Sequence, residues 1–202
     1  MAVKIILFDF DGTLSSGDAN FGFYYYTFRR SWRPALFLPL IAAGAIAKLF
    51  NPYGIWPRET MRRYLTANMV KKFAPGFIAE HKRNRFGWAA DKTAEEKARG
   101  AIVICISASP NYLLKPLVAD LGFDFVICSE MEKARPWKYA KPCWNKYKVA
   151  RLAEWMMEEE IEKTDVVRAY SDSKSDLPMM DLAKEQVWIN PRTGTRSCRR
   201  RG

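Results

Sequence analysis

The segment VKIILFDFDGTL, residues 3–14, constrains the fold more than any other part of the chain. A nearly continuous apolar run leads directly into Asp9 and Asp11, and Gly12 and Thr13 follow. Such runs are typical of strands that are buried on both faces of a parallel sheet. Because the two aspartates are two positions apart, strand alternation predicts that both carboxylates point to the same side at the strand's carboxyl end.

Three later apolar runs, residues 101–106, 123–128 and 165–171, are predicted to be strands of the same kind. Helical segments separate them: TAEEKARG, which ends at Gly100, then NYLLKPLVADLG, then WNKYKVARLAEWMMEEE. Alternating strands and helices favour an α/β fold, a doubly wound, Rossmann-like parallel sheet.

Residues 18–91 do not continue this alternation of strands and helices, because they are rich in aromatic residues, have a helical pattern and contain no clear strand. We therefore expect an inserted helical cap domain there. The catalytic core would consist of residues 1–17 and 92–202.

Within the insert, residues 33–50 read RPALFLPLIAAGAIAKLF, with no charge over residues 34–47. A membrane-spanning helix needs about 20 apolar residues, and Pro39 and Gly44 weaken a straight helix. Aromatic and basic flanks on both sides suit an interfacial membrane anchor. The run could equally be the apolar core of the insert, and the sequence leaves both interpretations open.

The chain is basic, with 33 Lys and Arg against 22 Asp and Glu, a formal charge of +11. This surplus favours anionic partners such as nucleic acid, anionic lipid or a phosphorylated substrate. Part of it lies at the C-terminus, where a solvated tail is expected. That group comprises Arg196, Arg199, Arg200 and Arg201.

The cysteines and the N-terminus both favour a cytoplasmic protein. The four cysteines show no close CxxC pairing, so reduced thiols are the simplest interpretation and a zinc site is not expected. The first apolar run is short and meets acidic residues at once, unlike a signal peptide.

Polar residues follow the predicted strands where an open α/β sheet binds its ligands. Ser107 ends the second strand, and residues 108–110 are expected to begin a helix, whose free N–H groups suit phosphate oxygens. Asp172 and Asp176 follow the fourth strand. Each feature alone would usually be a turn or a helix cap. The carboxylates of Asp9 and Asp11 repel each other unless a cation or a shared proton relieves them, and magnesium prefers oxygen ligands.

In this order, DFDGTL, ISAS and YSDSKSDLPMM resemble three motifs of the haloacid dehalogenase (HAD) superfamily, and most closely those of subfamily IB, which includes phosphoserine phosphatases. The remaining motif supplies a lysine, with Lys141, Lys146 and Lys148 as candidates. The family wording of a Cys, then Lys-Val and a Leu, matches Cys143, Lys148 and Leu152, which favours Lys148.

The resemblance implies an Mg²⁺-dependent phosphatase. Asp9 would be the nucleophile and Asp11 the acid and base, which a dehalogenase would not need at that position. Mg²⁺ would be held by Asp9, the main-chain carbonyl of Asp11, and Asp172, and Asp176 would support Lys148 or a metal-bound water. The implied phosphate-binding residues are Gly12, Thr13, Ser107, Ala108 and Lys148.

The expected substrate is a phosphorylated small molecule or lipid. The stretch SSGDANFGFYYYTFRR after the first motif contains Asp18 but no Glu, unlike phosphoserine phosphatases, and with the ending WINPRTG it looks more like phosphatidylglycerophosphatase C. That resemblance implies a lipid phosphate such as phosphatidylglycerophosphate, met at the cytoplasmic face of an anionic membrane. The alternatives are a soluble phosphoserine phosphatase-like enzyme and a non-catalytic basic module that binds membrane or nucleic acid. No nucleic-acid-binding motif is visible, so no nucleic acid is expected.

Overall fold

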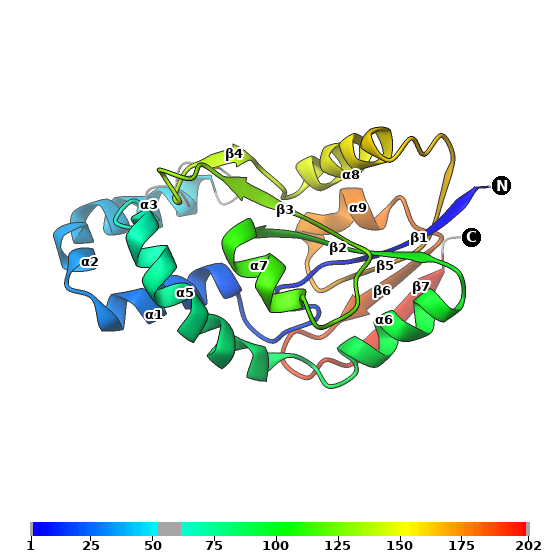
Figure 1. The fold of residues 1–202 in the computed structure, drawn as a ribbon, viewed down its shortest axis with the longest axis horizontal. Coiled ribbons are helices and arrows are strands. Elements are labelled where there is room, and N and C mark those ends of the chain that lie inside the picture. Colours follow the sequence, from blue (N-terminus) through cyan, green and yellow to red (C-terminus); the bar gives the residue numbers. More distant parts are fainter. Residues whose placement is uncertain (1, 52–61, 201–202) are drawn as a thin grey trace.

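The computed structural model describes residues 2–51 and 62–200, and a seven-stranded sheet forms its centre (Figure 1). The strand order is β4-β3-β2-β1-β5-β6-β7. The parallel strands are β1 (Val3–Phe8), β2 (Ile102–Pro110), β3 (Phe125–Met131), β5 (Thr164–Ser171) and β6 (Glu185–Ile189). Two antiparallel strands, β4 (Tyr139–Lys141) and β7 (Arg196–Arg200), form the edges. The doubly wound α/β fold expected from the sequence is confirmed.

Helices cover both faces of the sheet (Figure 1). The helices on one face are α6 (Ala89–Ala98) and α7 (Asn111–Val118), and those on the other are α8 (Lys146–Glu158) and α9 (Leu177–Met180). The side chains of β1 alternate between the two layers: Ile6 and Phe8 join the α7 side, and Ile5 and Leu7 join the α8 side. This double burial explains why the strand reads as a continuous apolar run.

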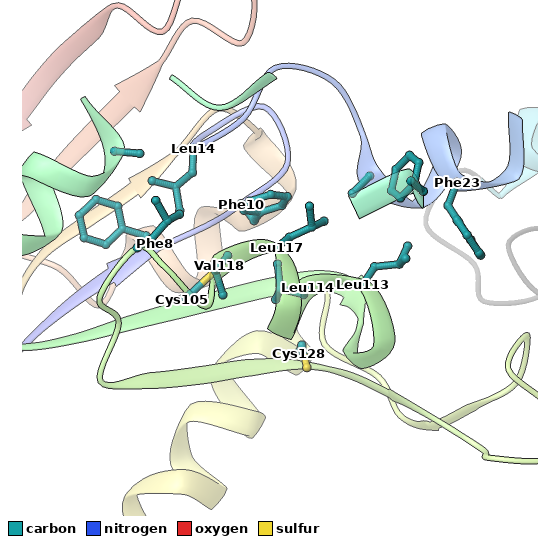
Figure 2. Packing of buried hydrophobic residues seen from close by; sticks show 14 of the residues in the cluster. Phe8, Phe10, Leu14, Phe23, Cys105, Leu113, Leu114, Leu117, Val118 and Cys128 are labelled. Atoms are coloured by element: carbon teal, nitrogen blue, oxygen red, sulfur yellow. The ribbon is translucent and has the colours of Figure 1, made fainter. Parts of the chain in front are cut away.

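The core on the α7 side extends from the sheet to the first helix that follows β1 (Figure 2). Phe8 and Phe23 lie at opposite ends of this cluster, and Phe10 lies between them (Figure 2). Asp9 therefore lies between two fully buried phenylalanines, Phe8 and Phe10, and Asp11 directly follows the second. This packing fixes the backbone on which the two carboxylates are mounted.

The insertion after the first motif is helical in its described part. Its elements are α1 (Ala19–Arg30), α2 (Arg33–Leu36), α3 (Leu38–Phe50), α5 (Ala67–His81) and the 3₁₀ turn η1 (Lys82–Asn84). Asp18 caps α1 and Thr66 caps α5, each by accepting a hydrogen bond from a backbone N–H three residues on. Figure 1 shows these helices at the end of the molecule away from both termini. We refer to them as the cap. The expected boundary at residue 91 falls inside α6.

The apolar run of residues 33–50 is largely exposed. In α3 only Gly44 is buried, and Leu36, Leu49 and Phe50 expose 65%, 80% and 86% of their surface. Phe37 and Ile41 are partly buried against the core, and most of the other described apolar side chains of the run are exposed. No helix within residues 2–51 and 62–200 is long and apolar enough to cross a membrane.

Two local expectations were wrong. The segment after Ser107 does not begin a helix, because β2 continues to Pro110 and α7 starts at Asn111. The basic C-terminal segment is exposed at residues 196–199 but is not a free tail, because it forms β7, which pairs with β6. Residues 201 and 202 lie outside the described residues. The edge strand β4 and the strands β6 and β7 were not predicted.

Candidate active site

A lysine joins two carboxylates at the carboxyl end of β1. Lys148, in the first turn of α8, donates to Asp9 Oδ1 at 2.6 Å and to Asp176 Oδ2 at 2.8 Å. All three residues are almost completely buried. Asp176 also accepts a 2.7 Å hydrogen bond from the hydroxyl of Ser171, the last residue of β5. The group links β1, α8 and the turn after β5, which are far apart in the sequence.

Charge pairing and burial shift the pKa values of Lys148 and Asp9 in opposite directions. Burial alone would lower the pKa of Lys148, but the carboxylates of Asp9 and Asp176 raise it above its ordinary value. Burial raises the pKa of Asp9, and the neighbouring ammonium opposes that rise. Lys148 is therefore a fixed positive charge beside Asp9.

The other lysine candidates lie outside this group. Lys141 is on the surface and pairs with Glu154 at 3.4 Å. Lys146 is exposed, with its ammonium 6.0 Å from the ring centre of Tyr147. Of the three lysines, Lys148 is the one placed beside Asp9.

Gly12 lets Asp172 approach the first motif. Its backbone has φ +75°, and a Cβ atom placed there would lie 2.3 Å from Asp172 Oδ2. Thr13 lies next to both carboxylates, with its hydroxyl 3.3 Å from Asp9 Oδ2 and 3.2 Å from Asp172 Oδ1. The backbone N–H of Asp172 donates to the same hydroxyl at 3.1 Å. Gly12 and Thr13 thus bring Asp9 and Asp172 to one side of the site.

These oxygen donors fit the expected Mg²⁺ ion. Within the described residues, no three His, Cys, Asp or Glu side chains gather closely enough to hold a metal. The expected ligand set needs only two, Asp9 and Asp172, together with the main-chain carbonyl of Asp11. Burial raises the pKa of both Asp9 and Asp172, so a divalent cation would relieve a real electrostatic cost.

Asp11 lies between the core and the cap. Its Oδ1 accepts a 2.6 Å hydrogen bond from the backbone N–H of Ala19 at the start of α1. Its Oδ2 accepts from the hydroxyls of Ser109 at 2.6 Å and Ser107 at 3.4 Å. Burial and the charge of Asp18 raise the pKa of Asp11 to about 7, although the hydrogen bonds from Ser109 and Ala19 oppose the shift. Asp11 can therefore gain or lose a proton near neutral pH.

The raised pKa of Asp11 predicts a pH-dependent stability. Between its unfolded value of about 3.8 and about 7, the folded chain holds a proton that the unfolded chain has released. The free energy of unfolding should therefore fall as pH rises through this window. In EDTA at pH 8, Asp11→Asn should unfold at a temperature higher by on the order of 5 °C, and at pH 4 the difference should be much smaller. Thermal melts from pH 4 to 8 would check this, and an equal difference at all pH values would contradict it.

These groups line one cavity of about 410 Å³. Its walls include every expected site residue except Thr13, whose hydroxyl contacts Asp9 and Asp172. The lining residues are Asp9, Asp11, Gly12, Gly17, Asp18, Ser107, Ala108, Trp144, Lys148, Asp172, Ser173, Ser175, Asp176 and Pro191. The walls thus come from the core strands' carboxyl ends and from the segment that enters α1.

Sequence reasoning did not identify several neighbours of the site. Ser109 was assigned to a helix start, yet its hydroxyl makes one of the two shortest contacts to Asp11. Ser171 was considered only as the end of a strand, although it holds Asp176. A signal existed for both, since each is a hydroxyl at a strand's carboxyl end. Trp144 had no such signal, because nothing in its local sequence places it against the cavity.

Comparison with known sequences extends the likeness over most of the chain. The profile of the haloacid dehalogenase-like hydrolases matches residues 6–181. A histidinol-phosphatase of Neisseria meningitidis serogroup C (strain 8013) is 28% identical over 99 residues, which cover 46% of this chain and 45% of that protein. The match thus spans less than half of that relative. Protein CicA of Caulobacter vibrioides is 26% identical over 200 residues, covering 90% of this chain and 84% of CicA.

Solved structures share the fold at low sequence identity. A protein of unknown function from Bordetella pertussis Tohama I has a TM-score of 0.78 at 18% identity, covering 96% of this chain and 93% of that one. A phosphoserine phosphatase in its apo form has a TM-score of 0.63, also at 18% identity, covering 91% of this chain and 84% of its own. At this identity the likeness concerns the fold.

Proposed function

Because the chain belongs to the haloacid dehalogenase-like hydrolase family, we propose that it is a phosphatase, which hydrolyses a phosphomonoester in two steps through Asp9. The observation that carries this proposal is the placement of Lys148 at 2.6 Å from Asp9 and of Asp11 in the same cavity. A nucleophile, a fixed cation and a proton-transfer group then surround one space.

In the first step, a carboxylate oxygen of Asp9 attacks phosphorus and the bond to the leaving oxygen breaks. Lys148 favours the ionised form of Asp9, which is the nucleophilic one. Asp11 gives its proton to the leaving oxygen, which departs as an alcohol. The product on the enzyme is an aspartyl-phosphate.

In the second step, water attacks the phosphorus of the aspartyl-phosphate. Asp11, now ionised, takes a proton from that water, the bond between phosphorus and Asp9 breaks, and phosphate is released. Lys148, Ser107 and the backbone around Gly12, Thr13 and Ala108 would bind the phosphoryl oxygens. Bound Mg²⁺, held by Asp9, Asp172 and the carbonyl of Asp11, would neutralise charge on those oxygens.

Asp176 is proposed to position Lys148. It accepts from the ammonium at 2.8 Å and is itself held by Ser171. The position of the ammonium is therefore fixed before the substrate binds.

The proposed substrate is a lipid phosphate such as phosphatidylglycerophosphate, and the proposed site of action is the cytoplasmic face of an anionic membrane. Support comes from the exposed apolar side chains of α2 and α3, which a soluble small-molecule phosphatase would not need. The resemblance of residues 15–30 and of WINPRTG to phosphatidylglycerophosphatase C supports the same substrate class.

A phosphate-release screen tests the reaction and the substrate together. The substrates would be phosphatidylglycerophosphate, phosphatidate, phosphoserine, histidinol phosphate and sugar phosphates, each with Mg²⁺ and with EDTA. Mg²⁺-dependent release that is fastest with a lipid phosphate is expected. Release from small phosphates alone would favour a soluble enzyme, and no release from any phosphomonoester would contradict the proposed reaction.

Asp11→Asn should separate proton transfer from the rest of the reaction. We expect hydrolysis of alkyl phosphates to fall about 10²–10⁴-fold, the usual contribution of general acid–base catalysis. The loss should be smaller for formation of the aspartyl-phosphate from an aryl phosphate, whose leaving group needs no proton. A burst of released nitrophenol followed by slow turnover would show this, and unchanged alkyl phosphate hydrolysis would exclude Asp11 as the acid.

A further inference from the structure

Helix α1 carries two side-chain stripes that face two cavities away from the catalytic one. The first stripe is aromatic and consists of Phe21, Tyr24, Tyr25 and Phe28. The second contains Gly22, Tyr25, Tyr26, Arg29 and Arg30. Both follow the three- and four-residue spacing of a helix face, and Tyr25 belongs to both. An apolar space and a basic space therefore lie side by side along one helix.

The apolar space is a groove of about 250 Å³ between α1 and α3. Ile41 of α3 and Tyr64 complete its walls. Phe21, Tyr25 and Phe28 remain 59%, 58% and 44% exposed. Large aromatic side chains so exposed along a groove mark a binding surface for an apolar ligand.

The basic space is a pocket of about 610 Å³ between α1, α5 and η1. Arg29, Arg30 and Arg83 line it, against a single carboxylate, Glu80, which pairs with Arg30 at 3.2 Å. Over the described ranges, neither Arg29 nor Arg83 has an acidic partner within ion-pair distance. Arg29 instead lies over the ring of Tyr25 at 5.7 Å. Burial lowers the pKa of His81, the remaining titratable wall residue at neutral pH, so His81 adds no charge there.

We infer that these two spaces form a binding site for an anionic phospholipid, with an acyl chain in the aromatic groove and the headgroup phosphate in the basic pocket. The paired chemistry selects this ligand: a free phosphate would leave the groove empty, and a neutral lipid would leave Arg29 and Arg83 without a counter-charge. The cap lipid site, as we call it, shares no lining residue with the catalytic cavity. It deepens the proposed function, on which it rests for the membrane location.

The surroundings of the cap lipid site indicate that the lipid is presented by a bilayer. Leu36, Leu49 and Phe50 are exposed on the neighbouring α2 and α3, and Lys48 is exposed among them. Apolar side chains beside basic ones suit the boundary between headgroups and acyl chains, and each basic residue near an anionic surface strengthens binding about fivefold. The groove and the pocket would lie within the same boundary.

The test compares vesicle binding with activity on a soluble substrate. The full chain is floated with vesicles of phosphatidylcholine alone or of phosphatidylcholine mixed with phosphatidylglycerol, across a salt series. We expect binding to the anionic vesicles that weakens with salt but persists, because the apolar part is unscreened. Hydrolysis of p-nitrophenyl phosphate by each variant shows that the catalytic domain is folded.

Two variants test the basic pocket and the aromatic groove of the cap lipid site separately. Arg29→Gln/Arg83→Gln should weaken binding to anionic vesicles about tenfold or more and flatten its salt dependence. Phe28→Asp should weaken binding at every salt concentration. The matched controls are Lys4→Gln/Lys163→Gln, exposed at the amino ends of β1 and β5, and Met157→Asp, an 81% exposed residue on α8. The controls should bind as the parent does.

A single lipid molecule is probed with dihexanoyl-phosphatidylglycerol below its micellar concentration. Titration calorimetry should show binding by the parent and at least tenfold weaker binding by each site variant. Equal binding by the site variants and their controls would overturn the inference, as would inorganic phosphate binding as tightly as the lipid. If the parent does not bind vesicles but hydrolyses p-nitrophenyl phosphate, the cap lipid site is contradicted and the proposed reaction is not. Vesicle binding without any phosphatase activity would instead contradict the reaction alone.

Discussion

Replacing Asp9 by Asn is expected to abolish turnover, with a loss of at least about 10³-fold. An amide is a poor nucleophile, so the aspartyl-phosphate cannot form. The fold should be preserved, because Asn has nearly the same shape and its carbonyl can still accept from Lys148, which keeps its 2.8 Å bond to Asp176. Phosphate release would measure the loss of turnover, and labelling of the enzyme by ³²P-substrate would measure the loss of the aspartyl-phosphate.

The matched control for this variant is Asp91→Asn, an exposed aspartate in the first turn of α6. It should keep the parent's turnover and melting temperature. If Asp9→Asn retained more than about a tenth of the parent's rate, Asp9 could not be the nucleophile. A melting temperature that fell sharply only for Asp9→Asn would mean that the group around Lys148 is chiefly structural.

The second large effect is expected from Gly12→Ala. The new Cβ would meet the Asp172 carboxylate at 2.3 Å, which no rotation of the alanine can relieve. Asp172 must move away, and the expected Mg²⁺ site would lose its shape. We expect activity to fall at least about 100-fold and the Mg²⁺ concentration for half-maximal rate to rise. Activity measured over a magnesium series would show both effects.

Gly100→Ala separates the clash from the strain of the backbone. Gly100 has the same φ of +75°, but a Cβ there would meet nothing within 4 Å. Both variants carry the left-handed penalty of about 1–2 kcal/mol, so both should melt at lower temperature. Only Gly12→Ala should lose activity and magnesium response. Equal activity of the two variants would show that the close approach of Asp172 to Gly12 does not matter.

The central strands could be predicted because each is buried on both faces. In β1 the run Ile5, Ile6, Leu7 and Phe8 supplies both helical layers, so every position is apolar and the pattern is clear. The motif residues after the strands could be grouped for a similar reason. Parallel strands end at one edge of the sheet, and this brings Asp9, Ser107 and Asp172 to one cavity.

The features that could not be predicted depend on contacts between segments that are far apart in the sequence. Residues 108–110 continue β2 because Pro110 pairs with Ser129 of β3, and a propensity argument favours a helix there. A buried helix and an exposed membrane-binding helix can have the same apolar composition, so the sequence of α3 could not distinguish these two alternatives. The segment of β7 is rich in arginine and lacks strand-forming side chains, yet it pairs along the whole of β6.

The two strands that end the sheet have a consequence for how the protein behaves at high concentration. An open strand edge can pair with another chain and start aggregation. Here β4 offers only three residues for such pairing, and β7 carries the exposed side chains of Arg196 and Arg199. Two copies that met along β7 would bring like charges together across the new strand pair. The arginines near the C-terminus thus oppose self-association while β7 completes the sheet.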